Sequence, residues 1–137
     1  MMKEKRILSI DYGKKRIGLA LSDPLFTFAY SYKTLINDKN LWENIAEIIK
    51  EKNVVKVILG LPNEIKNKSL ATIISNFKKG IEKRFKLEVI TWDEEYTSVI
   101  AQERIIESVT KKNKRRDKGL IDRNSAAVIL QEYLDGL

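Results

Sequence analysis

Two apolar runs near the start of the chain are joined by a short polar segment. The first run extends from Arg6 to Asp11 and the second from Arg16 to Ser22. Apolar runs of this length with a glycine-containing turn between them predict two antiparallel strands in a β-hairpin. The next segment, Leu25 to Leu35, contains four aromatic residues and favours a third antiparallel strand.

Further along the chain, the spacing of apolar residues changes to steps of three and four. Leu41 and Ile45 begin such a stripe, which predicts an amphipathic helix that ends near Asn53. Asn40 and Glu43 stand at the positions of a capping box. The same helical spacing predicts three later helices, over residues 70–81, 99–109 and about 120–134.

Two more strands alternate with these helices. Val54 to Leu61 is nearly all apolar, as expected of a strand buried on both faces of a parallel sheet, and Phe85 to Trp92 forms the fifth strand. Right-handed crossovers place the fourth and fifth strands beside the first. The sequence therefore predicts one α/β domain over residues 1–137. Its five-stranded mixed sheet has the order 3-2-1-4-5, with strand 2 antiparallel and helices on both faces.

Composition narrows the chemistry available to this fold. The chain has 137 residues, 43% of them hydrophobic, and contains neither cysteine nor histidine. Ser-His and Cys-His mechanisms and imidazole-ligated zinc are therefore excluded, so acid–base chemistry must come from carboxylates, Lys, Tyr or metal-bound water. The net charge of +7 favours a polyanionic partner. No segment resembles a signal peptide or a membrane span, which together with the lack of cysteine favours a cytoplasmic location.

Three carboxylates from distant parts of the sequence are candidates for a shared site. Asp11 ends the central strand, Glu94 follows the fifth strand, and Asp122 shares an inward helical stripe with Ala126. Ligands of α/β folds gather at the carboxyl ends of parallel strands, so the three carboxylates can converge. Simpler interpretations exist: Asp11 can begin a turn in which Gly13 has a positive φ, and Asp122 can complement the helix dipole.

Converging carboxylates suit hard cations. Mg²⁺ and Mn²⁺ prefer oxygen ligands, and one or two such ions can activate water and stabilise the leaving oxygen in phosphodiester hydrolysis. If the inner faces of the hairpin coincide, Gly18 and Ala20 leave room beside Asp11 for an ion or a phosphate. The hypothesis is a catalytic metal site formed by Asp11, Glu94 and Asp122.

Two groups of cations accompany these carboxylates. One follows Asp11 in the hairpin turn and the other precedes the last helix, where they can hold phosphates without reading bases. A charge run of this kind is otherwise a solvated loop. Tyr12 and Tyr96 can stack on unpaired bases or pack in the core. The candidate nucleic-acid-binding residues are Lys14, Lys15, Arg16, Lys111, Lys112, Lys114, Arg115 and Arg116.

Four motifs, in this order, resemble the YqgF family. They are Ile10–Asp23, Gly60–Pro62, Asp93-Glu94 before Thr97, and Asp122 with Ala126-Ala127 and Ile129–Gln131. This RNase H-like group is described both as Holliday junction resolvases and as nucleases of pre-16S rRNA 5′-end maturation. The resemblance covers essentially the whole chain. It implies an RNase H-like fold and places the family's acidic site on Asp11, Glu94 and Asp122.

Two positions depart from the family pattern. Glu95 stands where the family commonly has Arg, which removes a phosphate contact and adds a negative charge near the site. Asn67 stands where the family commonly has Gly, and asparagine tolerates the left-handed conformation that such a loop needs.

These observations predict a metal-dependent endonuclease that acts on structured nucleic acid, either pre-rRNA or branched DNA. The resemblance implies 5′-end processing of pre-16S rRNA in ribosome biogenesis, or Holliday junction resolution, with pre-ribosomal particles as further partners. We expect a monomer or a weak homodimer. An alternative is a non-catalytic nucleic-acid-binding ribosome assembly factor in which Glu95 marks a decayed site. An ATPase of the actin or sugar-kinase type ranks last, because that fold needs two such domains.

Overall fold

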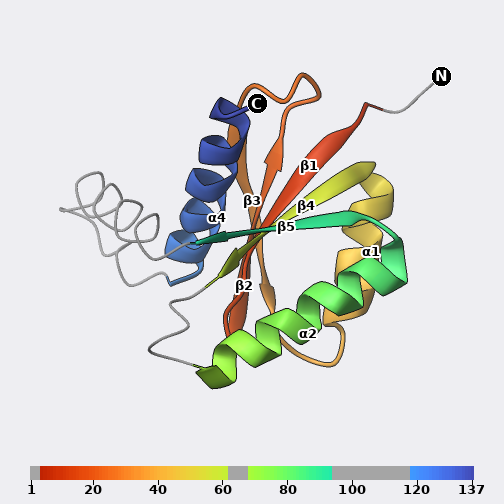
Figure 1. The fold of residues 1–137 in the computed structure, drawn as a ribbon, viewed down its shortest axis with the longest axis vertical. Helices are drawn as coiled ribbons and strands as arrows, with labels where there is room; N and C mark the ends of the chain where they lie inside the picture. Colours follow the sequence, from red (N-terminus) through yellow and green to blue (C-terminus); the bar gives the residue numbers. More distant parts are fainter. Residues whose placement is uncertain (1–3, 62–67, 94–117) are drawn as a thin grey trace.

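A five-stranded mixed sheet forms the centre of the molecule (Figure 1). The computed structural model describes residues 4–61, 68–93 and 118–137. The central strand β1 pairs antiparallel with β2 and parallel with β4, and the sheet order β3-β2-β1-β4-β5 confirms the predicted order. The strands are β1 (Arg6–Asp11), β2 (Arg16–Ser22), β3 (Ala29–Ile36), β4 (Val54–Leu61) and β5 (Glu88–Asp93).

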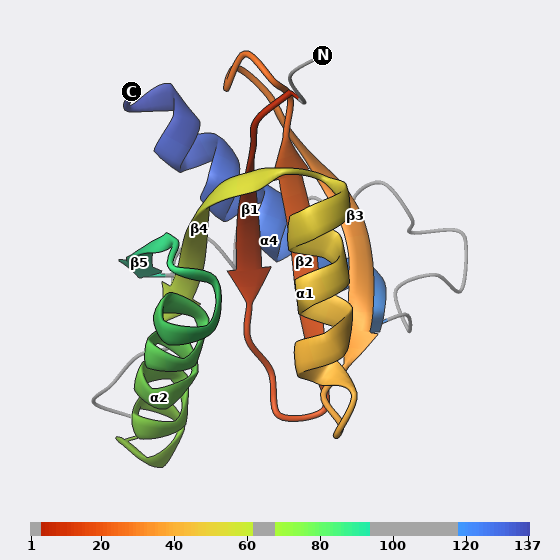
Figure 2. The same ribbon diagram turned by 90° about the vertical axis from the view of Figure 1, so that its right-hand side faces the viewer.

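Helices cover both faces of the sheet, as predicted. Figure 2 shows two of them in front of the sheet and the C-terminal helix behind it. They are α1 (Leu41–Glu51) and α2 (Lys68–Phe85) on one face and α4 (Lys118–Asp135) on the other. The helix predicted over residues 99–109 lies outside the described residues. Among the residues that the structure describes, no helix has the length and apolar character needed to cross a membrane.

The third strand is shorter than predicted and begins at Ala29. The Asp23 carboxylate accepts hydrogen bonds from the N–H groups of Phe28 (2.9 Å) and Thr27 (2.7 Å), and these fold the preceding residues into a loop. The hydrogen bond from Phe28 is the main reason why the pKa of Asp23 lies below its ordinary value. Leu25 is 83% exposed. The prediction of a strand from Leu25 is therefore wrong over its first residues.

The boundary between α2 and β5 also differs from the prediction. Phe85, predicted to begin the fifth strand, is the last residue of α2 and packs against the core from that helix. Lys86 has a φ of 54°, which ends the helix, and β5 begins at Glu88. The apolar side chain of Phe85 serves a helix as well as a strand, so its hydrophobicity alone did not separate the two.

The first helix begins at Leu41 as predicted, but without the capping box. The side chain of Asn40 makes no capping hydrogen bond; its backbone N–H donates to Asp38 Oδ1 at 2.9 Å instead. The helix ends at Glu51. Asn53 then has a φ of 51°, a left-handed conformation that asparagine tolerates, and this turns the chain into β4.

Side-chain alternation in the central strands divides the core into two clusters. In β1, Leu8 and Ile10 lie in the cluster beneath α1 and α2, whereas Ile7 lies in the cluster beneath α4. Because alternate residues of a strand face the same side, Ser9 and Asp11 share the α4 face with Ile7. The α4 residues that cover this face are Ala126, Ile129, Leu130 and Leu134.

A glycine inside α2 makes room for a tryptophan from α1. A Cβ atom at Gly80 would lie 2.7 Å from Cη2 of Trp42. The Trp42 ring stacks on Phe77 with a centroid distance of 5.1 Å, and the Arg84 guanidinium lies 4.4 Å from the Trp42 ring centroid. Close contact between the two helices explains a glycine at a helical position, where its conformational entropy is otherwise unfavourable.

Candidate active site

Asp11 is the last residue of the central strand and lies on the face that α4 covers. Its pairing partner in the β1–β2 hairpin is Gly18, which has no side chain, and the next pair on this face joins Ser9 to Ala20. Asp11 is half-buried. The pairing confirms that the inner faces of the hairpin coincide and that Asp11 has small neighbours across the strand.

The strand that leads to the second predicted acid ends at the same edge of the sheet. β4 is parallel to β1 and β5 is parallel to β4, so the carboxyl-terminal ends of all three strands lie at the same end of the sheet. The last residue of β5 is Asp93, and Glu94 follows it in the sequence. Glu94 itself lies outside the described residues, as does the basic run over residues 111–116.

The third predicted acid, Asp122, belongs to the first half of α4. Ala126, one helical turn later, is fully buried against the sheet. In the second half of α4, Gln131 Oε1 accepts a hydrogen bond from the N–H of Ala29 at 2.9 Å. Ala29 lies at one end of the β2–β3 ladder, and Gly18, the pairing partner of Asp11, lies toward the other end. The first half of α4 therefore extends toward the end of the sheet that carries Asp11. The side chain of Asp122 lies outside the described residues.

The turn after Asp11 requires a glycine because the chain approaches itself closely. A Cβ atom at Gly13 would overlap the carbonyl oxygen of Arg16. The expectation of a positive φ at Gly13 is wrong, because no glycine in the described part of the chain has one. Steric room, not left-handed backbone, thus accounts for glycine at this position.

Asn37, which directly follows β3, holds this turn from the neighbouring hairpin. Its Nδ2 donates to the carbonyl oxygen of Gly13 (2.9 Å) and to the hydroxyl of Tyr12 (3.1 Å), and its N–H donates to the carbonyl of Lys15 (2.9 Å). Lys15 and its neighbour Lys14 are exposed. The turn therefore presents its cations from a backbone that Asn37 holds at two carbonyl groups, with a third bond to the side chain of Tyr12.

Tyr12 packs in the core, as one of its two interpretations predicts. Its ring centroid lies 4.9 Å from that of Phe77 on α2, and its hydroxyl accepts the hydrogen bond from Asn37. A ring held in this way does not stack on a base. Tyr96, the other candidate, lies outside the described residues.

Two residues before Asp11, on the same face, lies a buried hydroxyl. Ser9 is fully buried, and within the part of the chain that the structure describes its Oγ makes no hydrogen bond. Ser22, also fully buried, differs because its Oγ accepts a hydrogen bond from the N–H of Ile7 at 2.8 Å. The two serines thus share a strand pair and a degree of burial but differ in hydrogen bonding.

We expect opposite effects on stability from removing these two hydroxyls. Ser9→Ala should leave the free energy of unfolding unchanged or raise it by about 1 kcal/mol, because an unsatisfied buried hydroxyl is removed. Ser22→Ala should lower it by about 1–3 kcal/mol, because the N–H of Ile7 loses its partner. Urea denaturation of both variants measures the difference. Loss of stability in Ser9→Ala comparable to that in Ser22→Ala would contradict the prediction.

The donor chemistry of this region fits a hard cation. Asp11 offers carboxylate oxygens, and Gly18 opposite it brings no side chain toward them. Within residues 4–61, 68–93 and 118–137, no three acidic, His or Cys side chains cluster as a metal site. This absence does not bear on the predicted set, because Glu94 and the side chain of Asp122 lie outside the described residues.

Sequence reasoning missed Asn37 and Ser9. Asn37 stood in a polar break, which indicated only a loop, and nothing in the sequence linked it to a turn far earlier in the chain. Ser9 carried a detectable signal: a hydroxyl in an otherwise apolar strand, two residues before Asp11 and therefore on the same face.

The sheet order, the helices on both faces and the acid at the end of the central strand define an RNase H-like fold. Solved resolvases share this fold. The Fowlpox virus resolvase in complex with Holliday junction DNA aligns with a TM-score of 0.59 and 20% identity, covering 96% of this chain and 97% of that one. RuvC of T. thermophilus, in complex with a Holliday junction substrate, aligns with a TM-score of 0.52 and 15% identity, covering 96% and 94%.

Sequence comparison identifies the family within this fold. The RuvX family model, described as Holliday junction resolvase, matches residues 5–136. Relatives from Porphyromonas gingivalis and Bacteroides thetaiotaomicron are 39% and 38% identical over 133 residues, which cover 95% of this chain and 96% of each relative. Both carry the provisional name of pre-16S rRNA nuclease. The chain belongs to the RuvX family, which confirms the resemblance to YqgF proteins.

Proposed function

We propose that the protein is a divalent-metal-dependent endonuclease acting on structured nucleic acid, with the 5′ end of pre-16S rRNA as its favoured substrate and the Holliday junction as the alternative. The observation that carries the proposal is Asp11, a carboxylate at the end of the central strand, opposite Gly18 and beside a turn of three cations. Membership of the RuvX family supports the same activity. We assign it to one nuclease domain over residues 1–137.

We assign Asp11, Glu94 and Asp122 as catalytic residues and as ligands of one or two Mg²⁺ or Mn²⁺ ions. A divalent ion bound there would supply a Lewis acid for phosphodiester hydrolysis. Asp11 would fix one ligand position because it stands on the central strand, and its pairing partner Gly18 brings no side chain toward it. The chain contains no histidine, so the ligands on offer are the oxygen donors that these ions prefer.

We assign the cations near the site to the phosphates of the substrate. Lys14 and Lys15 lie on the turn that follows Asp11, Arg16 begins β2, and Asn37 fixes the backbone of this turn. The run Lys111, Lys112, Lys114, Arg115 and Arg116 precedes α4 in the sequence and would contact more of the same backbone. Contacts to phosphate do not read bases, so selectivity would come from the shape of the nucleic acid.

The choice of substrate rests on two kinds of relative. Proteins 35–39% identical to this chain carry the name of pre-16S rRNA nuclease, which supports RNA. Structures that share the fold contain Holliday junction DNA, which supports branched nucleic acid. A pre-rRNA nuclease works where ribosomes are assembled, so we place the protein in the cytoplasm with pre-ribosomal particles as partners. We also propose that it is a monomer or a weak homodimer.

Cleavage assays with two substrates test this proposal. A 5′-extended 16S precursor and a four-way DNA junction are each incubated with the protein in Mg²⁺, Mn²⁺ or EDTA. We expect cleavage of the precursor in either metal, none in EDTA, and recovery when metal is restored. Equal cleavage in EDTA would refute metal dependence, and cleavage of the junction alone would assign the DNA substrate.

A non-catalytic assembly factor is the second candidate, and Glu95 favours it. This acid stands where an arginine commonly occurs, next to the predicted ligand Glu94. Substrate binding without cleavage under any metal would support this candidate. If Glu95→Arg then gains cleavage activity, Glu95 itself is the cause of the loss.

A further inference from the structure

A second basic surface lies at the opposite end of β1 from Asp11. Arg6 is the first residue of β1 and Asp11 the last, so they are about 17 Å apart at about 3.3 Å per residue. The Arg6 Nη1 donates to the carbonyl of Ser22 and to the hydroxyl of Tyr30, both at 2.9 Å. These bonds fix the guanidinium on the α1/α2 side of the sheet, opposite to the face of Asp11.

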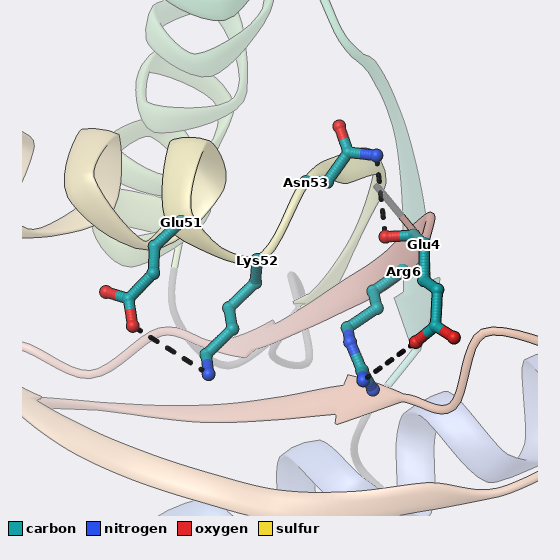
Figure 3. Close-up of a pocket in the computed structure, with 5 residues that line it drawn as sticks. All are labelled: Glu4, Arg6, Glu51, Lys52 and Asn53. Atoms are coloured by element: carbon teal, nitrogen blue, oxygen red, sulfur yellow. Dashed lines mark hydrogen bonds and ion pairs between the residues drawn. The ribbon is translucent and has the colours of Figure 1, made fainter. Parts of the chain in front are cut away.

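Arg6 and Lys52 point into the same open pocket (Figure 3). The pocket has a volume of about 290 Å³ and is lined by Glu4, Arg6, Glu51, Lys52 and Asn53. Its two carboxylates are 72% and 61% exposed, and each lies 3.9 Å from its cation, at the outer limit of an ion pair. Long pairs with exposed carboxylates are weak, so the two acids offset the charges of Arg6 and Lys52 only slightly.

An exposed tyrosine lies beside Arg6, and an exposed phenylalanine stands two residues before it in the sequence. Phe28 is 67% exposed and Tyr30 is 43% exposed. Phe28 precedes the first residue of β3, but its carbonyl accepts a hydrogen bond from the N–H of Asp23 at 3.0 Å, which continues the β2–β3 pairing by one residue, so alternation puts it on the same side as Tyr30. Both residues are held by hydrogen bonds. The Asp23 carboxylate holds the N–H of Phe28, and Arg6 holds the hydroxyl of Tyr30.

Further along β3, the ring of Tyr32 lies close to Lys52 and to one further cation, Lys33. The ammonium of Lys33 lies 4.9 Å from the ring centroid of Tyr32, and that of Lys52 lies 5.5 Å from it. Lys33 is exposed. The row of aromatic residues on β3 is therefore bordered by Arg6, Lys33 and Lys52.

We propose that this basic aromatic surface (Arg6, Phe28, Tyr30, Lys33 and Lys52) binds an unpaired segment of nucleic acid that flanks the cleavage position, a role that rests on the proposed nuclease function. Phe28 and Tyr30 stack on successive bases, and the three cations hold the phosphates between them. Stacking of this kind needs exposed base faces, so the occupant is a single strand and not a duplex. β3 is an edge strand of the sheet. A single-stranded segment of nucleic acid that leaves the Asp11 end of the sheet therefore reaches the basic aromatic surface by passing β3.

Binding of a short fluorescein-labelled oligouridine, followed by fluorescence anisotropy, tests the surface without catalysis. Phe28→Ala should weaken binding about tenfold, because one stacked base is lost. Lys33→Gln should lower the slope of log K against log salt by about 0.7, the value for one phosphate contact to a single strand. Glu51→Gln should tighten binding about twofold, because it removes a negative charge beside Lys52.

The matched control is Lys83→Gln on α2. Lys83 is exposed and lies on a helix that contributes nothing to the surface. This variant changes the net charge as Lys33→Gln does, and it should leave both affinity and salt slope at the wild-type values. Thermal unfolding of Phe28→Ala should match that of the wild type, because the ring is largely exposed.

Cleavage kinetics then place the surface in the reaction. On a precursor with a single-stranded flank, Phe28→Ala should raise KM about tenfold and leave kcat within about twofold, since only binding is affected. On a substrate without the flank, neither constant should change. If the protein cleaves nothing but the binding results hold, the surface stands and the proposed nuclease function fails.

Two results would overturn the inference while leaving the nuclease function intact. One is oligouridine binding by Phe28→Ala and Lys33→Gln at wild-type affinity. The other is an equal loss of affinity for a duplex of the same length, which would show that the rings do not stack on unpaired bases.

Discussion

Asp11→Asn is expected to lower the rate of phosphodiester cleavage on the order of a thousandfold, which corresponds to about 4 kcal/mol of activation free energy. The amide occupies the same volume at the end of β1 but carries no charge, so it holds a divalent cation poorly. Calorimetric titration with Mg²⁺ should show a matching loss of metal affinity. Substrate binding in the absence of metal should persist, because the variant removes a negative charge that faces the phosphates.

The matched control for this variant is Glu82→Gln. Glu82 is an exposed carboxylate on α2, on the face of the sheet opposite Asp11. The substitution makes the same change in net charge and should leave the cleavage rate within about twofold of the wild type. Cleavage by Asp11→Asn at the control's rate would remove Asp11 from the catalytic site.

Gly13→Ala should lower the free energy of unfolding by about 1–3 kcal/mol. The new Cβ overlaps the carbonyl oxygen of Arg16, a backbone atom that cannot rotate away as a side chain can. The turn must open, and the hydrogen bond from Asn37 to the carbonyl of Gly13 is strained with it. Because Lys14 and Lys15 move with this turn, KM for a nucleic-acid substrate should rise as stability falls.

Gly136→Ala serves as the control for this prediction. A Cβ atom there would lie 3.6 Å from the carbonyl oxygen of Tyr133, an ordinary van der Waals contact. The position does not have a positive φ, so alanine should change the free energy of unfolding by less than about 0.5 kcal/mol. Urea denaturation compares the variants. Equal stabilities would show that the turn relaxes without cost.

Much of the fold could be predicted because local patterns and topology agreed. The alternation in Arg6–Asp11 and Arg16–Ser22 defined the hairpin, and the continuous apolar run of Val54–Leu61 indicated a strand buried on both faces. The handedness of crossovers then left one sheet order, which the structure confirms.

The boundaries could not be predicted, because they depend on contacts that the pattern does not contain. The segment from Leu25 has the composition of a strand, but the Asp23 carboxylate binds the backbone of Phe28 and makes it a loop. Phe85 has the hydrophobicity of a strand residue, but the helix retains it because its ring packs near Trp42, with centroids 6.3 Å apart.

At the candidate site, the residue types could be predicted but not the supports that position them. Asp11 was identifiable because a carboxylate at the end of a central apolar strand is unusual. Its small neighbours were expected only if the inner faces of the hairpin coincide, which the pairing with Gly18 confirms. The hydrogen bonds from Asn37 to the turn could not be predicted, because a neutral amide in one loop carries no sequence signal that links it to another loop. The assignment of Glu94 and Asp122 remains a proposal that the variants test.

The division of the core between the two faces of β1 also restricts how the gene for this protein can change. Ile7 and Asp11 lie on one side of the strand, and Leu8 and Ile10 on the other. An insertion or deletion of one residue between Ile7 and Asp11 would exchange odd and even positions, placing the carboxylate beneath α1 and α2. A substitution in β1 therefore changes one side chain on one face, whereas a change in the length of the strand by one residue moves all the residues after it to the opposite face.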